Sequence, residues 1–222
     1  VGMWSFAVLR PSSEEEIASL TTASESLIER FGLFTIIVLG EVVVGVVEGM
    51  SESEDTAIAI TTGMIALSIG FAFWWSYFDF VGGRKVRTAG AAFTRWMLGH
   101  LPVTGAIAAA GAAMVGIVEH AGDARTPAPN AWLLSGSVAV GLFGLVWITG
   151  SLEDARRLPH VYRPLAGLLV LAALFSLLLA WMRPAPWLFV GLIWVALSLV
   201  WFLSVVRWFG IDDGEAVPGT IE

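Results

Sequence analysis

A carboxylate inside an apolar run is the group in this sequence best placed to do chemistry. Residues 29–49 read ERFGLFTIIVLGEVVVGVVEG, with Glu41 near the middle of the run. An ionisable group within a membrane-length segment is by default a functional candidate, because it can exchange a proton or hold a cation. It can also remain neutral and form a hydrogen bond between two helices. The sequence leaves both interpretations of Glu41 open.

The spacing of the charged residues predicts that they share one face of a helix. Successive helical residues rotate by about 100°, so Glu41 lies about 20° from Arg30, and Glu48 lies in line with Arg30 again. The same stripe contains Phe34, Ile37 and Val44. Glu41 is about 16 Å deeper than Arg30, near the bilayer centre, where an ionised carboxylate costs about 2.5–3.5 kcal/mol. We therefore predict that the stripe faces the inside of a helix bundle, with Glu41 protonated or partnered.

The ends of this segment carry the other members of the candidate polar path. Glu29 suits the positive end of the helix dipole. Arg30 can either extend its charged head to the interface or act as a counter-charge inside the bundle. Glu48 approaches the opposite interface, where simple solvation is the alternative to a role in the path.

Asp79 and His100 form a second group of candidates. Asp79, in WWSYFDFVGG, ends a helix at its negative pole, so a partner is expected from among Arg84, Lys85 and Arg95, with solvation as the alternative. His100, in RWMLGHLPVTG, lies inside the next helix, close to a proline that frees a backbone carbonyl. It is either a satisfied core histidine or part of a polar cluster with Asp79 and Arg30 beneath Glu41.

Several classes of function are excluded or disfavoured by composition and motifs. The chain has no cysteine, so disulfides, thiolate metal sites and cysteine nucleophiles are excluded. Its net charge of −7 and lack of a basic stripe disfavour nucleic acid as a partner. No phosphate-binding loop, dinucleotide fingerprint, HExxH or GxSxG is present, and we expect no cofactor. The three histidines, at 100, 120 and 160, fall in separate contexts, so we expect no metal site.

The elements that must position these residues are membrane-spanning helices. Of the 222 residues 57% are hydrophobic and only 14% are charged, whereas soluble chains are about a quarter charged. Six windows can cross a hydrocarbon core of about 30 Å. They cover about 27–49, 57–80, 95–119, 131–151, 165–182 and 187–207. We predict an all-α polytopic bundle that forms a single transmembrane domain over 1–210.

The two ends of the chain are not among the six spans. Residues 1–9, VGMWSFAVL, are apolar but too short to span, and they are interpreted as the stump of a preceding helix. The stretch 211–222 is acidic and without aromatic residues, and we predict a disordered tail.

The distribution of basic residues predicts the orientation. If the N-terminal end of the first full span is cytoplasmic, ten of the twelve Lys and Arg residues fall inside. Loops 81–94 and 152–164 are then cytoplasmic, and loops 50–56 and 120–130 are external. The positive-inside rule therefore predicts a multi-pass protein with this topology, and we expect it in the plasma membrane.

The third span carries small residues at the spacing that lets membrane helices approach closely. Ala108, Ala112 and Gly116 recur at every fourth position. We predict that this span is central and packs its small residues against the Arg30–Glu41–Glu48 stripe. A leucine at Ala112 should then be tolerated less well than one at Ala173. The last two spans carry no internal acid or base, and we expect them to be lipid-facing.

Three motifs together resemble a known family. ERFGLFTIIVLGE at 29–41, WWSYFD at 74–79 and GHLP at 99–102 resemble the bacterial low-temperature-requirement A family of membrane proteins. The resemblance covers about 25–120, and the remainder matches only as further hydrophobic spans. It implies an N-terminal half of further helices, which would be a partner of this region. A histidine often precedes ERFG in the family, whereas Ser26 stands at that place here. The family is named for growth in the cold, and the resemblance implies no substrate.

Three functions remain open. The first is a transporter or channel-like bundle for an unknown small molecule or ion, with Glu41 as the protonatable group of an internal path. The second is a membrane-embedded enzyme acting on a lipid or lipid-linked substrate through Asp79, His100 and Arg30, which would have to converge. The third is a structural or regulatory membrane protein in which the carboxylates only form hydrogen bonds between helices. In each case the lipid bilayer is a partner, and a homo-oligomer is compatible with the sequence.

Overall fold

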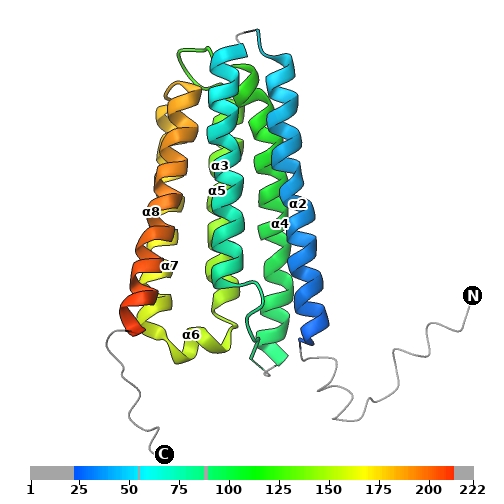
Figure 1. Ribbon diagram of the computed structural model, residues 1–222, viewed down its shortest axis with the longest axis vertical. Coiled ribbons are helices and arrows are strands. Elements are labelled where there is room, and N and C mark those ends of the chain that lie inside the picture. Colours follow the sequence, from blue (N-terminus) through cyan, green and yellow to red (C-terminus); the bar gives the residue numbers. More distant parts are fainter. Residues whose placement is uncertain (1–22, 55, 88–89, 213–222) are drawn as a thin grey trace, which may run out of the picture.

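The computed structural model describes residues 23–54, 56–87 and 90–212, and within these ranges it is a bundle of helices without strands (Figure 1). The helices are α2 (Glu25–Glu52), α3 (Thr56–Phe80), α4 (Gly90–Glu119), α5 (Ala128–Thr149), α6 (Glu153–Arg157), α7 (Pro159–Met182) and α8 (Pro186–Asp212). The all-α prediction is confirmed. The predicted stump 1–9, and the predicted tail from residue 213 on, lie outside the described residues.

Six of these helices are long and apolar enough to cross a membrane, which confirms the predicted spans. Two of them, α4 and α7, begin five or six residues earlier than expected. In α4 the Thr94 hydroxyl donates to the Gly90 carbonyl and supports the first turn. In α7 Pro159 occupies the first turn, where a missing N–H does no harm, and Pro164 follows inside the helix. The short α6 was not expected, because its sequence EDARR reads as a charged loop.

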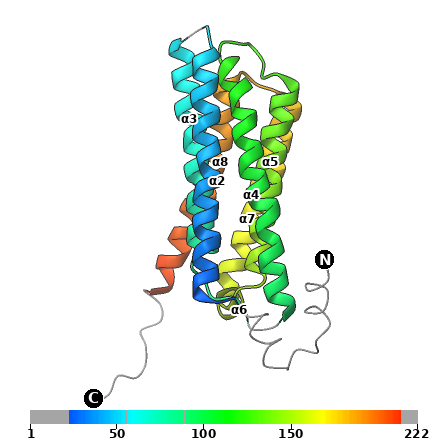
Figure 2. The same ribbon diagram turned by 90° about the vertical axis from the view of Figure 1, so that its right-hand side faces the viewer.

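The six long helices form a closed ring in the order α2, α4, α5, α7, α8 and α3. Figures 1 and 2 show them running side by side along the long axis of the molecule. Helix α4 contacts α2, α5 and α3, so the predicted contact between the first and third spans is confirmed. The most apolar stretches of α4 and α5 are 56% and 61% buried, against 28% for α2. The core therefore lies around α4 and α5, and α2 is a peripheral helix.

The connections between helices pair at the two ends of the bundle. At one end Glu153 N–H donates to the Lys85 carbonyl at 3.0 Å, and Arg87 N–H donates to the Ser151 carbonyl at 3.1 Å. At the other end Thr126 donates to the Pro184 carbonyl from both its N–H and its hydroxyl. The predicted grouping of loops 81–94 and 152–164 at one end, opposite 120–130, agrees with these bonds. Which end is cytoplasmic remains a prediction.

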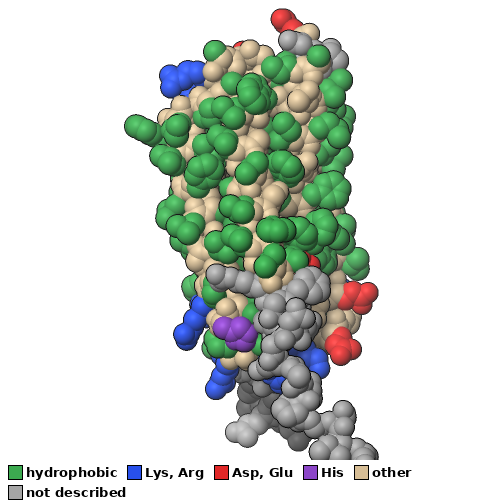
Figure 3. Space-filling model, turned by 60° about the vertical axis from the view of Figure 1, so that its left-hand side comes forward, with side chains coloured by type: hydrophobic (Ala, Val, Ile, Leu, Met, Phe, Trp, Pro, Cys, Tyr) green, Lys and Arg blue, Asp and Glu red, His purple; other side chains and the backbone are tan. Residues whose placement is uncertain are grey.

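The outer surface has the chemistry of a multi-pass membrane protein. Large apolar side chains project from the sides of the bundle, among them Ile37, Phe71 and Leu171, which are 72%, 67% and 63% exposed. Figure 3 shows this apolar belt, with charged side chains gathered toward the two ends. Contact with the lipid bilayer along the sides follows from this distribution.

Candidate functional site

A hydrogen-bonded pair of buried side chains joins α3 to α4. The Tyr77 hydroxyl lies 2.9 Å from His100 Nε2, and His100 Nδ1 lies 2.8 Å from the Trp96 carbonyl oxygen. Tyr77 and His100 are only 2% and 1% exposed. A buried imidazole without a carboxylate partner is neutral. Because a carbonyl can only accept, Nδ1 carries the proton and Nε2 accepts from the Tyr77 hydroxyl.

Helix α2 closes this pair from the third side. The Phe31 ring packs 4.6 Å from the imidazole and 4.8 Å from the indole of Trp96, between ring centroids. Thr35 is fully buried beside Tyr77, and its hydroxyl donates to the Phe31 carbonyl at 2.9 Å. The pair thus has aromatic rings around it and satisfied nitrogens. We call it the Tyr77–His100 clamp, because it lies between three helices. Its contacts agree with the interpretation of His100 as a satisfied core histidine.

Pro102 shapes the outer side of α4 rather than the surroundings of the clamp. Proline has no N–H, so the carbonyl of Leu98 loses its helical partner. Leu98 and Pro102 are both exposed, whereas His100 is buried. The Thr104 hydroxyl donates to the His100 carbonyl at 2.8 Å and steadies the turn that contains the proline.

Asp79 has a partner, but not one of those expected. Its Oδ2 accepts a 2.9 Å hydrogen bond from the indole N–H of Trp201 on α8. The Arg84 guanidinium binds the Asp79 backbone carbonyl at 2.7 Å and the Asp154 carboxylate at 3.2 Å. Tyr77 and Asp79 are two residues apart and therefore lie on different faces of α3. The predicted cluster of Asp79, His100 and Arg30 is not assembled by these contacts.

The stripe on α2 exists, but it does not face the inside of the described bundle. Glu41, Glu48 and Arg30 are all exposed, and so are the three apolar members of the stripe between them. Within the described part of the chain, the Glu41 carboxylate forms no hydrogen bond or ion pair.

The cause of this reversal is a pair of glycines on the neighbouring face. A methyl group at Gly45 would overlap the Gly111 carbonyl of α4, and one at Gly49 would lie 2.5 Å from the Val115 carbonyl. Helix α2 therefore meets α4 where it has no side chains, as small residues allow in membrane bundles. Glu41 lies at the edge of this contact, since a methyl group at Gly111 would lie 2.5 Å from the Glu41 carbonyl. Its backbone contacts α4, while its side chain projects outward.

The small residues of α4 also turn out differently. Ala112 is exposed, Ala108 is half-buried and Gly116 contacts Asn130 of α5. Ala173 is fully buried in the core. The expectation that a leucine would disturb Ala112 more than Ala173 is thus reversed within this bundle, because four-residue spacing identifies a face but not its neighbour.

The other candidate residues lie at the two ends of α2. Glu29 lines a hollow with Glu25 and Lys85 near the N-terminal end of the helix. Glu48 lies near the other end, two turns beyond Glu41. Sequence reasoning missed Tyr77 and Thr35, although a tyrosine within an apolar span must find a partner for its hydroxyl.

Comparisons with known proteins identify a single family. The family model described as bacterial low temperature requirement A protein (LtrA) matches residues 3–200. No curated protein and no solved structure matches the chain.

Proposed function

The chain belongs to the bacterial low-temperature-requirement A family, and we propose that it is a transport-type membrane protein in which Glu41 handles a proton or small cation. The observation that carries the proposal is the exposed Glu41 carboxylate at mid-membrane depth. The 28 residues of α2 extend about 42 Å, which matches a bilayer of about 40–45 Å with its headgroups. Glu41 lies about 24 Å from Glu25, within about 3 Å of the helix midpoint.

A carboxylate at this depth is not left in lipid. The cost of about 2.5–3.5 kcal/mol for an unpaired charge favours a position against protein or in a water-filled path. The described helices leave this side of α2 open. We propose that the transmembrane helices which the family resemblance implies before this region cover it, and that the path runs along the resulting seam.

The neighbouring surface of α4 suits such a seam. Gly105 and Ala112 are exposed beside α2, and Ala108 is half-buried. A methyl group added at Gly105 would meet nothing within 4 Å. Small side chains let a further helix approach closely. A covering helix would therefore enclose Glu41 between two protein walls.

The stripe would reach both interfaces only with water between its members. Arg30 lies about 16 Å from Glu41 toward one interface, and Glu48 lies about 10 Å away toward the other. Glu41 would exchange its proton or cation through water with Glu48 on one side and with the solvent on the other, since Arg30 keeps its own proton and repels cations. The Tyr77–His100 clamp has a supporting role in this proposal, since it fixes α2 against α3 and α4.

A flux measurement tests the proposal. Full-length protein in liposomes with an internal pH dye, or a trapped cation indicator, should show flux under a membrane potential. Glu41→Gln keeps the shape and hydrogen bonding of the side chain but cannot exchange a proton, and it should reduce flux at least tenfold at unchanged stability. Glu52→Gln, at the end of the same helix, is the matched control. Wild-type liposomes without flux, or a Gln variant with full flux, would refute the proposal.

The two alternative functions, an enzyme and a structural protein, can be distinguished from the transport function. No observation favours an enzyme that uses Asp79, His100 and Arg30, because Asp79 binds Trp201 and His100 binds Tyr77. If Glu41 is purely structural, the Glu41→Gln variant should keep both its stability and growth in the cold.

We propose that the protein lies in the plasma membrane with the N-terminal end of α2 in the cytoplasm, because loops rich in Lys and Arg lie at that end.

A further inference from the structure

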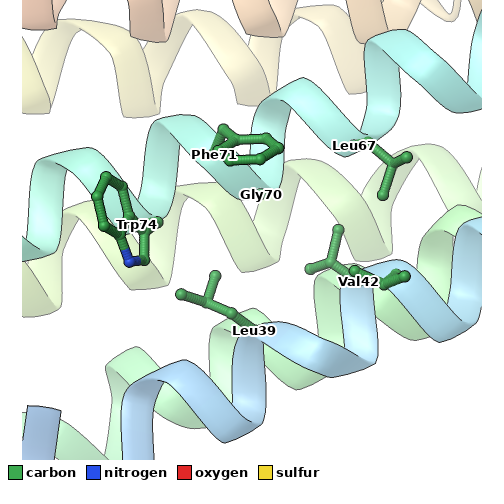
Figure 4. A pocket seen from close by; sticks show the side chains of 7 residues that line it. Leu39, Val42, Leu67, Gly70, Phe71 and Trp74 are labelled. Atoms are coloured by element: carbon green, nitrogen blue, oxygen red, sulfur yellow. The ribbon is translucent and has the colours of Figure 1, made fainter. Parts of the chain in front are cut away.

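Two hollows follow one another along the outer seam between α2 and α3. The first, of about 470 Å³, lies at the N-terminal end of α2 and carries Glu25, Glu29 and Lys85. The second, of about 180 Å³, is lined by Leu39, Val42, Val43, Leu67, Gly70, Phe71 and Trp74. Figure 4 shows the side chains of α2 and α3 facing one another across it. The first hollow is charged, and the second is apolar throughout.

The two hollows are adjacent along both helices. On α2, Ile36 of the charged hollow precedes Leu39 of the apolar groove by one turn. On α3, Phe78 and Trp74 are in contact, with ring centroids 5.5 Å apart. One occupant can therefore lie in both.

The seam is long enough to accommodate one leaflet of a membrane. From Glu25 to Val43 is 18 residues, or about 27 Å along α2. One leaflet measures about 20–22 Å, that is, half of a bilayer of about 40–45 Å with its headgroups. With α2 spanning the bilayer as proposed above, the charged hollow is at headgroup depth and the apolar groove reaches just past the bilayer centre.

The charges of the first hollow are free to bind a ligand. Within residues 23–54, 56–87 and 90–212, the side chains of Glu25, Glu29 and Lys85 form no hydrogen bond or ion pair. The floor beneath them is apolar and includes Phe78 and Ile36. Glycines at 82 and 83 keep the rim low, and Gly83 has a positive φ of 70° that favours glycine.

We propose that this seam binds one phospholipid with a primary ammonium in its headgroup, a phosphatidylethanolamine. The Glu25 and Glu29 carboxylates accept hydrogen bonds from the ammonium, and the Lys85 ammonium binds the phosphate. An acyl chain fills the groove between Leu39 and Phe71. A quaternary choline has no N–H to donate, and an anionic phosphatidylglycerol would face two carboxylates without a cation of its own.

Lipid retention by the purified full-length protein tests the headgroup. Native mass spectrometry after exchange into micelles with defined lipids should show phosphatidylethanolamine bound about tenfold or more tightly than phosphatidylglycerol or phosphatidylcholine. The double variant Glu25→Gln/Glu29→Gln should remove this preference, and Lys85→Met should weaken all three lipids. Glu52→Gln, at the opposite end of α2, should change nothing.

A second variant tests the groove independently of the headgroup. Val43 is 51% exposed in the groove, so Val43→Phe should fill it without disturbing the core and should reduce retention about tenfold. Val195→Phe on α8, where the valine is 53% exposed, is the matched control. Equal retention of the three lipids, retention unchanged in the Glu25/Glu29 double variant, or equal retention in the two phenylalanine variants would each overturn the proposal.

Discussion

The glycine contact between α2 and α4 predicts that two glycine-to-alanine substitutions on α2 have different effects on the free energy of unfolding. At Gly40 a methyl group would meet nothing within 4 Å, whereas at Gly45 it would overlap the Gly111 carbonyl. Glycine in a helix interior is less stable than alanine by about 0.5–1 kcal/mol, so Gly40→Ala should raise the free energy of unfolding by that amount. Gly45→Ala gains the same helix propensity but forces the two backbones apart. Overpacking of this kind costs about 1–3 kcal/mol, which is the expected difference between the variants.

The difference can be measured by reversible unfolding in mixed micelles, with the helical signal followed as denaturing detergent is added. Gly40→Ala should unfold later than wild type and Gly45→Ala earlier than Gly40→Ala. Gly49→Ala should resemble Gly45→Ala, because its methyl group would lie 2.5 Å from the Val115 carbonyl, about 1 Å inside ordinary contact. If Gly45→Ala is as stable as Gly40→Ala, α2 does not approach α4 at these glycines, and the outward direction of Glu41 loses its cause.

Two further predictions concern the clamp and the topology. Tyr77→Phe should lower the free energy of unfolding by about 1–2 kcal/mol, because His100 Nε2 is then left buried without a donor. Tyr162→Phe should leave the free energy of unfolding nearly unchanged, because the Tyr162 hydroxyl is buried without a hydrogen-bond partner in the described structure. Equal effects in the same unfolding assay would contradict the hydrogen bond as the source of stability. Ser53→Cys and Arg87→Cys should react with an impermeant thiol reagent from opposite sides of the membrane, Arg87→Cys from the cytoplasm; labelling of both from one side would contradict the six-span topology.

The number and kind of elements could be predicted from the sequence because they depend on local properties. Windows of about 20 apolar residues identify the six spans wherever they pack, since the bilayer sets their length. Charged stretches identify the connections between the spans, although one of them, EDARR, forms the short helix α6. The N-terminal starts of α4 and α7 were missed because both helices extend beyond their apolar segments. In α4 a hydrogen bond from the Thr94 hydroxyl supports the first turn, and in α7 a proline occupies it.

The direction of each helical face could not be predicted in the same way. A rotation of 100° per residue places Arg30, Glu41 and Glu48 on one stripe, and the structure has that stripe. Which face turns inward depends on the neighbour, and the close approach at Gly45 and Gly49 determines it here. Cost arguments about buried charge assume that the described bundle is the only protein around the helix. The exposed Glu41 departs from the expectation of burial within the described bundle.

Partners of single polar residues depend on contacts between distant parts of the chain. Asp79 binds Trp201, which is 122 residues away, and no pattern around Asp79 identifies that indole. The charge-pairing rule pointed to Arg84, which does approach Asp79 but binds its backbone carbonyl. For His100 the neighbouring Pro102 indicated a freed backbone carbonyl, but that carbonyl belongs to Leu98 on the exposed side of α4, away from the buried imidazole.

The motif on α2 divides into two sets of residues with different neighbours. Phe31 and Thr35 pack on the Tyr77–His100 clamp, and Gly32 is buried beside Phe78, so close packing accounts for these three. Arg30 and Glu41 point away from every described helix, so packing within this bundle does not account for them. A helix selected only for packing would carry leucine or valine at the position of Glu41, as it does at most exposed positions around it. Packing within the described bundle thus leaves the carboxylate unexplained, and the transport path proposed on the outer side of α2 would account for it.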